Sequence, residues 1–192
     1  MLNLTGLTDR TDLCRRVAAC FPAPQVIVEV GVEKGLFSQE ILELCPAAHA
    51  WLVDPWAYQA AGYQDGCNVA QEAQDALYAL TCSRLRAYGS RATVVRDYSV
   101  AAAATFPDET AHLVYIDGNH AYDAVVADLA AWWPKIVPGG VLAGHDYTPG
   151  EPHIVGVIPA VNEFVARHGL TLHLVTNPAD PSWAVVKPET SP

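Results

Sequence analysis

Basic residues are scarce in this chain. It carries 11 lysines and arginines against 21 aspartates and glutamates among 192 residues, which gives a net charge of −10. A surface with this balance repels the phosphate backbone of nucleic acids and the anionic headgroups of membranes. The composition therefore predicts that neither nucleic acid nor membrane is a partner.

Paired cysteines and long apolar runs are also missing. The five cysteines include no CxxC pair, so neither a disulfide framework nor a cysteine zinc site is expected. No apolar run is long enough to span a bilayer, and the N-terminus does not join a cationic start to an apolar core. We therefore expect a reduced, cytoplasmic protein.

What the chain does contain is enough apolar sequence for a sizeable core. Its hydrophobic content is 51% and its mean hydropathy is +0.14, values that argue against disorder. Strand-like apolar runs alternate with helical patterns over most of the length, which predicts a doubly wound α/β sheet with helices on both faces. We interpret residues 1–192 as a single domain.

The expected elements can be given by residue range. Strands are predicted at 25–32, 50–53, 93–95, 113–116, 140–143, 170–175 and 183–187, and helices from Thr8 or Thr11 to about 20, then at 36–45, 69–88, 100–106, from about 122, and at 157–168. The connection between the last two strands is too short for a helical crossover. This final pair must therefore be antiparallel.

Polar side chains gather where two neighbouring strands of this arrangement end. One strand ends in Asp117, with His120 just beyond it, and the next ends in His145 and Asp146. Strands joined through one helix lie parallel, so both ends emerge at the same edge of the sheet, where open α/β sheets bind ligands. These four residues are the strongest candidates for chemistry.

Three other strand ends carry candidate binding residues. The turn from Glu29 to Gly35 is glycine-rich but is not GxGxxG, and Glu33 in its middle would repel a dinucleotide diphosphate; a plain tight turn is the alternative. Asp54 follows the glycine-rich turn at the spacing typical of an acid that accepts hydrogen bonds from ribose hydroxyls. The alternative is that it caps a loop. Asp97 could accept a hydrogen bond from an adenine amino group; the alternative is that it is a surface acid.

Together these motifs carry a resemblance. The order EVGVEKG, LVDPW, VVRDYS, IDGNHAY and PGGVLAGHDY, closed by an antiparallel hairpin, is similar to the class I S-adenosylmethionine-dependent methyltransferases, and more closely to the macrocin-type O-methyltransferases. The resemblance covers nearly the whole chain from residue 25. It implies a Rossmann-like sheet of seven strands, mostly parallel with an antiparallel C-terminal strand, that binds S-adenosylmethionine over its first strand ends.

The resemblance also implies roles for single residues. The cofactor-binding residues are then Glu29, Gly31, Gly35, Asp54, Asp97, Ser99 and Asp117. Trp56, in the loop after Asp54, is a further candidate for the adenosine pocket, and a plain loop anchor is the alternative. Many relatives hold a divalent metal beside the cofactor, and the ligand positions here are Asp117, His145 and Asp146. Relatives place two adjacent acids where this chain has His145 and Asp146. Imidazole suits ions softer than magnesium, so manganese and zinc are candidates as well.

The expected reaction is O-methylation of a small hydroxylated molecule such as a sugar or natural product. A metal would lower the pKa of the acceptor hydroxyl, and His120 is the first candidate for the base, with His145 second. The alternatives are a metal-dependent oxygenase or hydrolase on the same fold and a non-catalytic cofactor-binding module. A homodimer is the expected assembly if the short chain needs a partner to close its pocket.

Overall fold

The computed structural model describes residues 2–60, 63, 65–149 and 155–189. Its centre is one seven-stranded sheet with the order β3-β2-β1-β4-β5-β7-β6. The strands are β1 (Val26–Val30), β2 (His49–Val53), β3 (Ala92–Val95), β4 (Ala111–Ile116), β5 (Ile136–Gly144), β6 (His173–Leu174) and β7 (Trp183–Val186). The first five are parallel, and β7 is antiparallel to both β5 and β6. The predicted fold class and the antiparallel hairpin are confirmed.

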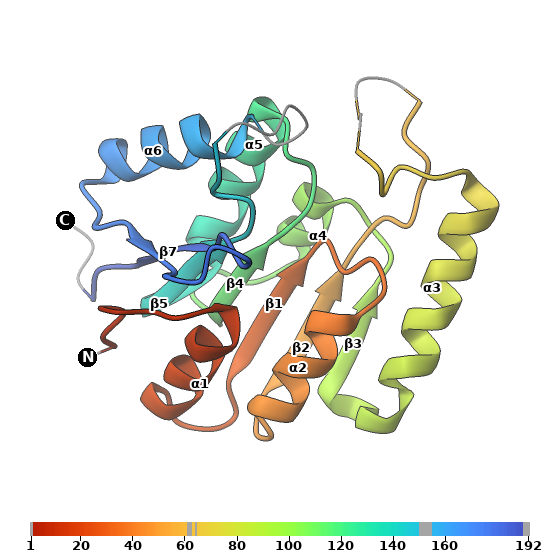
Figure 1. Cartoon of the computed structure of the whole chain (residues 1–192). Coiled ribbons are helices and arrows are strands. Elements are labelled where there is room, and N and C mark those ends of the chain that lie inside the picture. The colour runs from red at the N-terminus through yellow and green to blue at the C-terminus, as the bar shows by residue number, and fades with distance from the viewer. Residues whose placement is uncertain (1, 61–62, 64, 150–154, 190–192) are drawn as a thin grey trace.

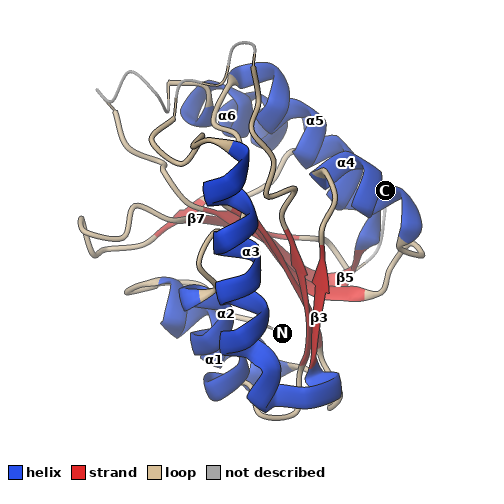
Figure 2. Ribbon diagram, turned by 90° about the vertical axis from the view of Figure 1, so that its right-hand side faces the viewer, coloured by secondary structure: helices blue, strands red, loops and turns tan. Residues whose placement is uncertain are grey.

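Helices cover both faces of this sheet, as Figures 1 and 2 show. One face carries α1 (Arg10–Cys20), α2 (Leu36–Leu44) and α3 (Gln71–Leu85), and the other carries α4 (Ser99–Thr105), α5 (Tyr122–Trp132) and α6 (Val157–His168). Two short 3₁₀ segments, η1 (Arg86–Arg91) and η2 (Trp133–Lys135), follow α3 and α5. Among the described residues, no helix combines the length and apolar character that crossing a membrane requires.

The core forms two apolar layers, one on each side of the sheet. Because the central strands are buried on both faces, their sequences are nearly continuous apolar runs instead of alternating ones. One layer packs Leu13 and Ile41 against Leu113, and the other packs Leu129 and Trp132 against Val114. The sheet is therefore held rigidly, and its carboxyl edge is a fixed platform for the loops that leave it.

Several local details differ from the sequence-based expectations. The side chain of Asp9, and not that of Thr8 or Thr11, caps α1 by accepting from the backbone N–H of Asp12. The helix predicted at 69–88 is shorter and ends at Leu85. The strand predicted at 140–143 begins at 136, and the one predicted at 170–175 is reduced to 173–174. Leu80 in α3 is 47% exposed, because α3 lies at the edge of the sheet beside β3 and has little core to cover (Figure 1).

Candidate active site

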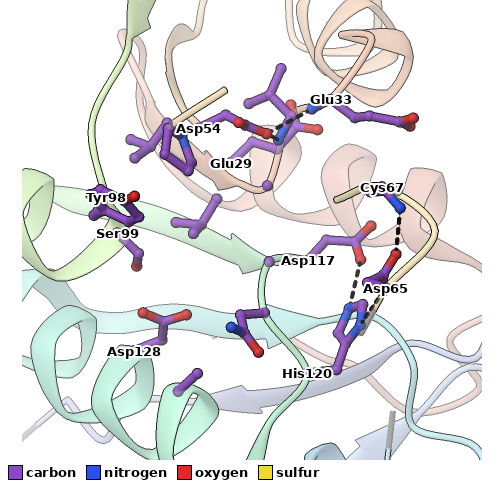
Figure 3. Close-up of a pocket in the computed structure, with 18 of the residues that line it drawn as sticks. Glu29, Glu33, Asp54, Asp65, Cys67, Tyr98, Ser99, Asp117, His120 and Asp128 are labelled. Carbon is purple, nitrogen blue, oxygen red and sulfur yellow. Dashed lines mark hydrogen bonds and ion pairs between the residues drawn. The ribbon is translucent and has the colours of Figure 1, made fainter. Parts of the chain in front are cut away.

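A cavity of about 570 Å³ opens at the carboxyl edge of the sheet. Its walls come from the residues that follow β1, β2, β4 and β5, together with the first turn of α4 and one side of α5. This is the ligand-binding edge of open α/β sheets. Figure 3 shows acidic side chains from several of these elements around one space.

Gly31 allows the loops after β1 and β4 to meet at this edge. Its φ is +87°, and a Cβ atom built on it would lie 1.9 Å from the carbonyl oxygen of Asp117. Only glycine permits this approach. Gly35 does not line the cavity; it starts α2 in a left-handed conformation with φ +71°.

Glu29 lies at the back of the cavity, in β1. It is 3% exposed and accepts a hydrogen bond from the hydroxyl of Ser38. Burial raises the pKa of Glu29 to about 8, and the bond from Ser38 opposes that rise. The structure thus places Glu29 where the resemblance puts a cofactor-binding acid.

Asp54 joins the loops after β1 and β2. Its Oδ2 accepts from the backbone N–H groups of Val32 (3.0 Å) and Glu33 (2.9 Å), and its Oδ1 accepts from that of Trp56 (2.7 Å). A carboxylate has about four acceptor directions, so one is left for a ligand. Asp54 lines the cavity and can accept from one ribose hydroxyl, whereas the sequence suggested that it would accept from two.

Two of the predicted cofactor residues point elsewhere. Trp56 is 1% exposed, donates from Nε1 to the carbonyl oxygen of Glu33 at 2.9 Å, and does not line the cavity. Asp97 is half-buried, accepts from the backbone N–H of Tyr98 and does not line the cavity. Both predictions are corrected: Trp56 ties its loop to the loop after β1, and the carboxylate of Asp97 bonds to the next residue of its own loop. Ser99 and Asp117 do line the cavity.

Asp128 is a cavity residue that the sequence reading missed. It comes from the middle of α5, is 5% exposed, and lies beside Ser99 (Figure 3). Ser99 in turn accepts from Nε1 of Trp132 at 2.9 Å. The available signal was a lone acid among the apolar residues of one helical face, with Val125, Leu129 and Trp132 around it.

Asp128 makes the stability of the protein depend on pH. Burial raises the pKa of Asp128 to about 6 from 3.8, and a hydrogen bond from Ser99 opposes that rise. As pH increases from about 3.8 to about 6, the unfolded chain loses this proton before the folded one does, so stability falls. At 1.36 kcal/mol per pKa unit the loss reaches up to about 3 kcal/mol.

We expect Asp128→Asn to remove this loss. By urea unfolding, the variant should be more stable than the parent at pH 8, with a difference that shrinks towards pH 4.5. Asp123→Asn, an exposed change on the same helix, is the control and should show no such trend. A gain that is equal at both pH values would contradict the assignment to Asp128.

His120 is held between carboxylates at the end of the cavity. Its Nδ1 lies 3.2 Å from Oδ2 of Asp65, and its Nε2 lies 2.9 Å from Oδ2 of Asp146 and 3.8 Å from Oδ1 of Asp117. The angles at Nε2 do not suit a hydrogen bond with any described residue, although this atom is buried. Asp117, Asp65 and His120 converge on the right of Figure 3. His120 does not cap α5, whose N-terminal cap is Ala121.

The pKa values of His120 and Asp146 follow from the charged groups around them. Burial alone would lower the pKa of His120, but the carboxylates of Asp117 and Asp146 outweigh burial and raise that pKa to about 10. The pKa of Asp146 lies well below its usual value because His120 and His145 favour its charged form over the opposing effect of burial. Without a metal, His120 is therefore an imidazolium at neutral pH and must lose that proton before it can act as a base.

His145 is turned away from the cavity. Its Nδ1 lies 3.1 Å from Oδ1 of Asp146 and 4.0 Å from Asp117, and its Nε2 lies 3.3 Å from Oδ1 of Asp180. It does not line the cavity. The ligating atoms that lie within 4.8 Å of one another belong to Asp117, His120 and Asp146. The metal-ligand set predicted from the sequence thus changes, with His120 in place of His145.

Comparisons with known proteins agree with this geometry. The methyltransferase domain family Methyltransf_24 matches residues 28–147. The O-methyltransferase NovP superposes with a TM-score of 0.66 at 18% identity, over 93% of this chain and 79% of its own. CalS11, a TDP-rhamnose 3′-O-methyltransferase of calicheamicin biosynthesis, superposes with a TM-score of 0.59 at 22% identity, over 90% of this chain and 76% of its own. Cofactor-bound Rv0187 from MTB superposes with a TM-score of 0.66 at 14% identity, over 95% of this chain and 80% of its own.

A curated relative is known by sequence as well. Protein y4gI of Sinorhizobium fredii is 26% identical over 161 residues, which are 77% of this chain and 17% of that protein. The chain thus spans less than a fifth of this relative. The family match covers more than half of the chain, from β1 to the residue after Asp146. The chain therefore belongs to the methyltransferase domain family.

Proposed function

We propose that the protein methylates a hydroxyl group of a small molecule, with a divalent cation held by Asp117, His120 and Asp146. The observation that carries this proposal is the position of these three ligating groups, within 4.8 Å of one another, on the wall of the cavity that is the candidate cofactor site. A cation there would lie beside the cofactor. That is where a methyl acceptor must be oriented.

The donor set fits a divalent cation. Two carboxylates and one imidazole suit manganese or zinc, and also magnesium if water completes the coordination. The buried Nε2 of His120 has no aligned hydrogen-bond partner among the described residues, which is unusual for a buried polar atom and supports a role as ligand. Asp65 would orient the imidazole from its other nitrogen.

Three effects at this site would prepare the acceptor for methyl transfer. A bound cation would lower the pKa of the acceptor hydroxyl. His145 and Asp180 would hold the carboxylate of Asp146 in place from behind. The cavity walls would exclude water and align the acceptor oxygen with the cofactor methyl group, which supplies proximity and orientation. The sequence suggested His120 as the base with or without a metal; in a metal-free site it would first have to release the proton that Asp117 and Asp146 favour.

The nature of the acceptor is supported by two independent observations. NovP is described as an O-methyltransferase and CalS11 as one that acts on a TDP-sugar, which favours a hydroxylated small molecule. The net charge of −10 disfavours nucleic acid. Homodimer formation, cytoplasmic location and the absence of a membrane partner stay predictions.

The experiment is a methyl-transfer assay on metal-stripped protein. Labelled S-adenosylmethionine is incubated with a panel of sugars, nucleotide sugars and phenols, with and without magnesium, manganese or zinc. We expect transfer to a hydroxyl that is lost with chelator and restored by one of these ions. Equal turnover without metal would contradict the metal-assisted version, and transfer only to nitrogen or carboxyl acceptors would contradict O-methylation.

The same assay separates the two remaining alternatives. A metal-dependent oxygenase or hydrolase would need iron or another metal and have no affinity for S-adenosylmethionine; the family assignment argues against it. A non-catalytic module would bind S-adenosylhomocysteine and transfer no methyl group to any member of the panel.

A further inference from the structure

Arg10 is a cation on the wall of a cavity that is lined mainly by acidic and uncharged residues. It is the first residue of α1, and the cavity lining includes it together with Glu29 and Phe37. Its backbone N–H donates to Oδ2 of Asp180 at 2.7 Å, which fixes the start of the helix. The guanidinium carbon lies 4.3 Å from the centre of the Phe37 ring. This contact holds the guanidinium at the cavity wall.

The donors of this guanidinium are unused. Its side chain makes no hydrogen bond to any residue that the structure describes, and its nearest carboxylate, Glu40, lies 4.0 Å from Nε. Only 26% of the side chain is exposed. By contrast, Arg16 on the same helix donates to the carbonyl oxygens of Asn3, Thr5 and Gly6 and to Asp12. Arg10 therefore presents free N–H groups to a cavity, in the planar arrangement that pairs with a carboxylate.

The other two basic side chains of the cavity wall, Lys34 and His120, already have acidic partners. Nζ of Lys34 lies 2.6 Å from Oε1 of Glu33, and the side chain is 47% exposed. The ring of His120 lies between the carboxylates of Asp65 and Asp146. A ligand carboxylate entering this cavity would therefore find in Arg10 a half-buried cation without a close carboxylate partner among the described residues.

The position of Arg10 matches one end of the cofactor. In the sheet, β1 lies between β2 and β4, so Asp54 after β2 and Ser99 after β3 mark the adenosine side of the cavity. Arg10 lies towards the other side, beside Asp180. Burial lowers its pKa, but Tyr115, Asp180, Glu40 and Asp117 outweigh burial and raise it. The carboxylate of Asp117 on that side attracts an ammonium group and repels a carboxylate.

We propose that Arg10 binds the α-carboxylate of S-adenosylmethionine, while the acidic groups around it receive the α-ammonium group. This inference depends on the proposed cofactor site and adds the residue that orients the amino acid end of the cofactor. By fixing that end, Arg10 sets the direction in which the methyl group points towards the acceptor.

The test compares two ligands that differ by one group. S-adenosylhomocysteine carries the carboxylate; its decarboxylated analogue keeps the adenosine, thioether and ammonium groups. Both are titrated calorimetrically into the parent protein, Arg10→Met and Arg15→Met. We expect Arg10→Met to weaken S-adenosylhomocysteine binding on the order of 10- to 100-fold, the range for a charge-assisted hydrogen bond, and to change the analogue about 3-fold or less.

The controls make each result decisive. Arg15→Met removes an exposed cation of the same helix that does not line the cavity, so it should change neither affinity. Arg10→Lys should recover part of the loss, because it restores the charge without the planar pair of donors. Unchanged S-adenosylhomocysteine affinity in Arg10→Met, or an equal loss for both ligands, would overturn the proposal. If the parent protein itself binds neither ligand, the proposed cofactor site fails, which is a separate result.

Discussion

Gly31→Ala is expected to abolish cofactor binding and to destabilise the fold. The added Cβ would lie 1.9 Å from the carbonyl oxygen and 2.4 Å from the carbonyl carbon of Asp117, so the loops after β1 and β4 would have to separate. The φ of +87° adds backbone strain. Together these effects should lower the free energy of unfolding, measured with urea, by about 3 kcal/mol. Calorimetric titration with S-adenosylhomocysteine should give no detectable heat of binding.

A second glycine provides the matched control. Gly169 ends α6 with φ +62° and ψ +35°, and a Cβ on it would meet nothing within 4 Å. Gly169→Ala should therefore lower the free energy of unfolding by only about 1 kcal/mol, the strain of a non-glycine residue in the left-handed conformation. It should leave the affinity for S-adenosylhomocysteine unchanged. If the two variants behave alike, backbone conformation and not close approach would be the reason for Gly31.

Asp146→Asn is expected to reduce turnover strongly while the protein keeps its fold. Asp146 has φ +59°, and asparagine tolerates that conformation as well as aspartate does, which makes it a better replacement than alanine. The change removes one charged ligand from the group with Asp117 and His120. Since even residues that support metal ligands change affinity or activity 10- to 100-fold, we expect a loss of at least about 100-fold in kcat/KM and weaker binding of manganese.

The control for this experiment lies on the surface. Asp108 is exposed and pairs with Lys135 at 2.6 Å, so Asp108→Asn removes the same charge far from the cluster and should keep full activity. Binding of S-adenosylhomocysteine to Asp146→Asn should stay within about 3-fold of the parent, because the metal ligands lie beside the cofactor and do not contact its adenosine half. Parent-like turnover in Asp146→Asn would refute the metal-assisted mechanism.

Much of the fold was predictable because it follows from short-range patterns. Near-continuous apolar runs identified the buried parallel strands, and Gly169 marked the end of α6 as expected. The short connection before β7 required an antiparallel pair. The residues after β1, β2, β4 and β5 were recognised as site residues because parallel strands end at one edge of a sheet, and most of them do line the cavity.

The direction of each side chain was not predictable in the same way. His120 and His145 are both close to strand ends, yet only His120 faces the cavity, because Asp180, far along the chain, lies against His145. Trp56 and Asp97 are next to the cavity in sequence, but Trp56 bonds to Glu33 in the loop after β1 and Asp97 bonds to Tyr98. Sequence spacing places a backbone, whereas packing against distant residues decides where a side chain points.

The sequence by itself therefore determined that Glu29, Asp54, Asp117 and Asp146 lie at or near the ends of parallel strands that emerge at one edge, because alternating patterns and crossover rules are local. Only the tertiary structure decided that His120 completes the metal-ligand group, that Asp128 enters the cavity from α5, and that Arg10 reaches it from α1. These residues lie on separate elements with no fixed spacing between them. Their meeting depends on how the helices pack against the sheet, and no local pattern encodes that packing.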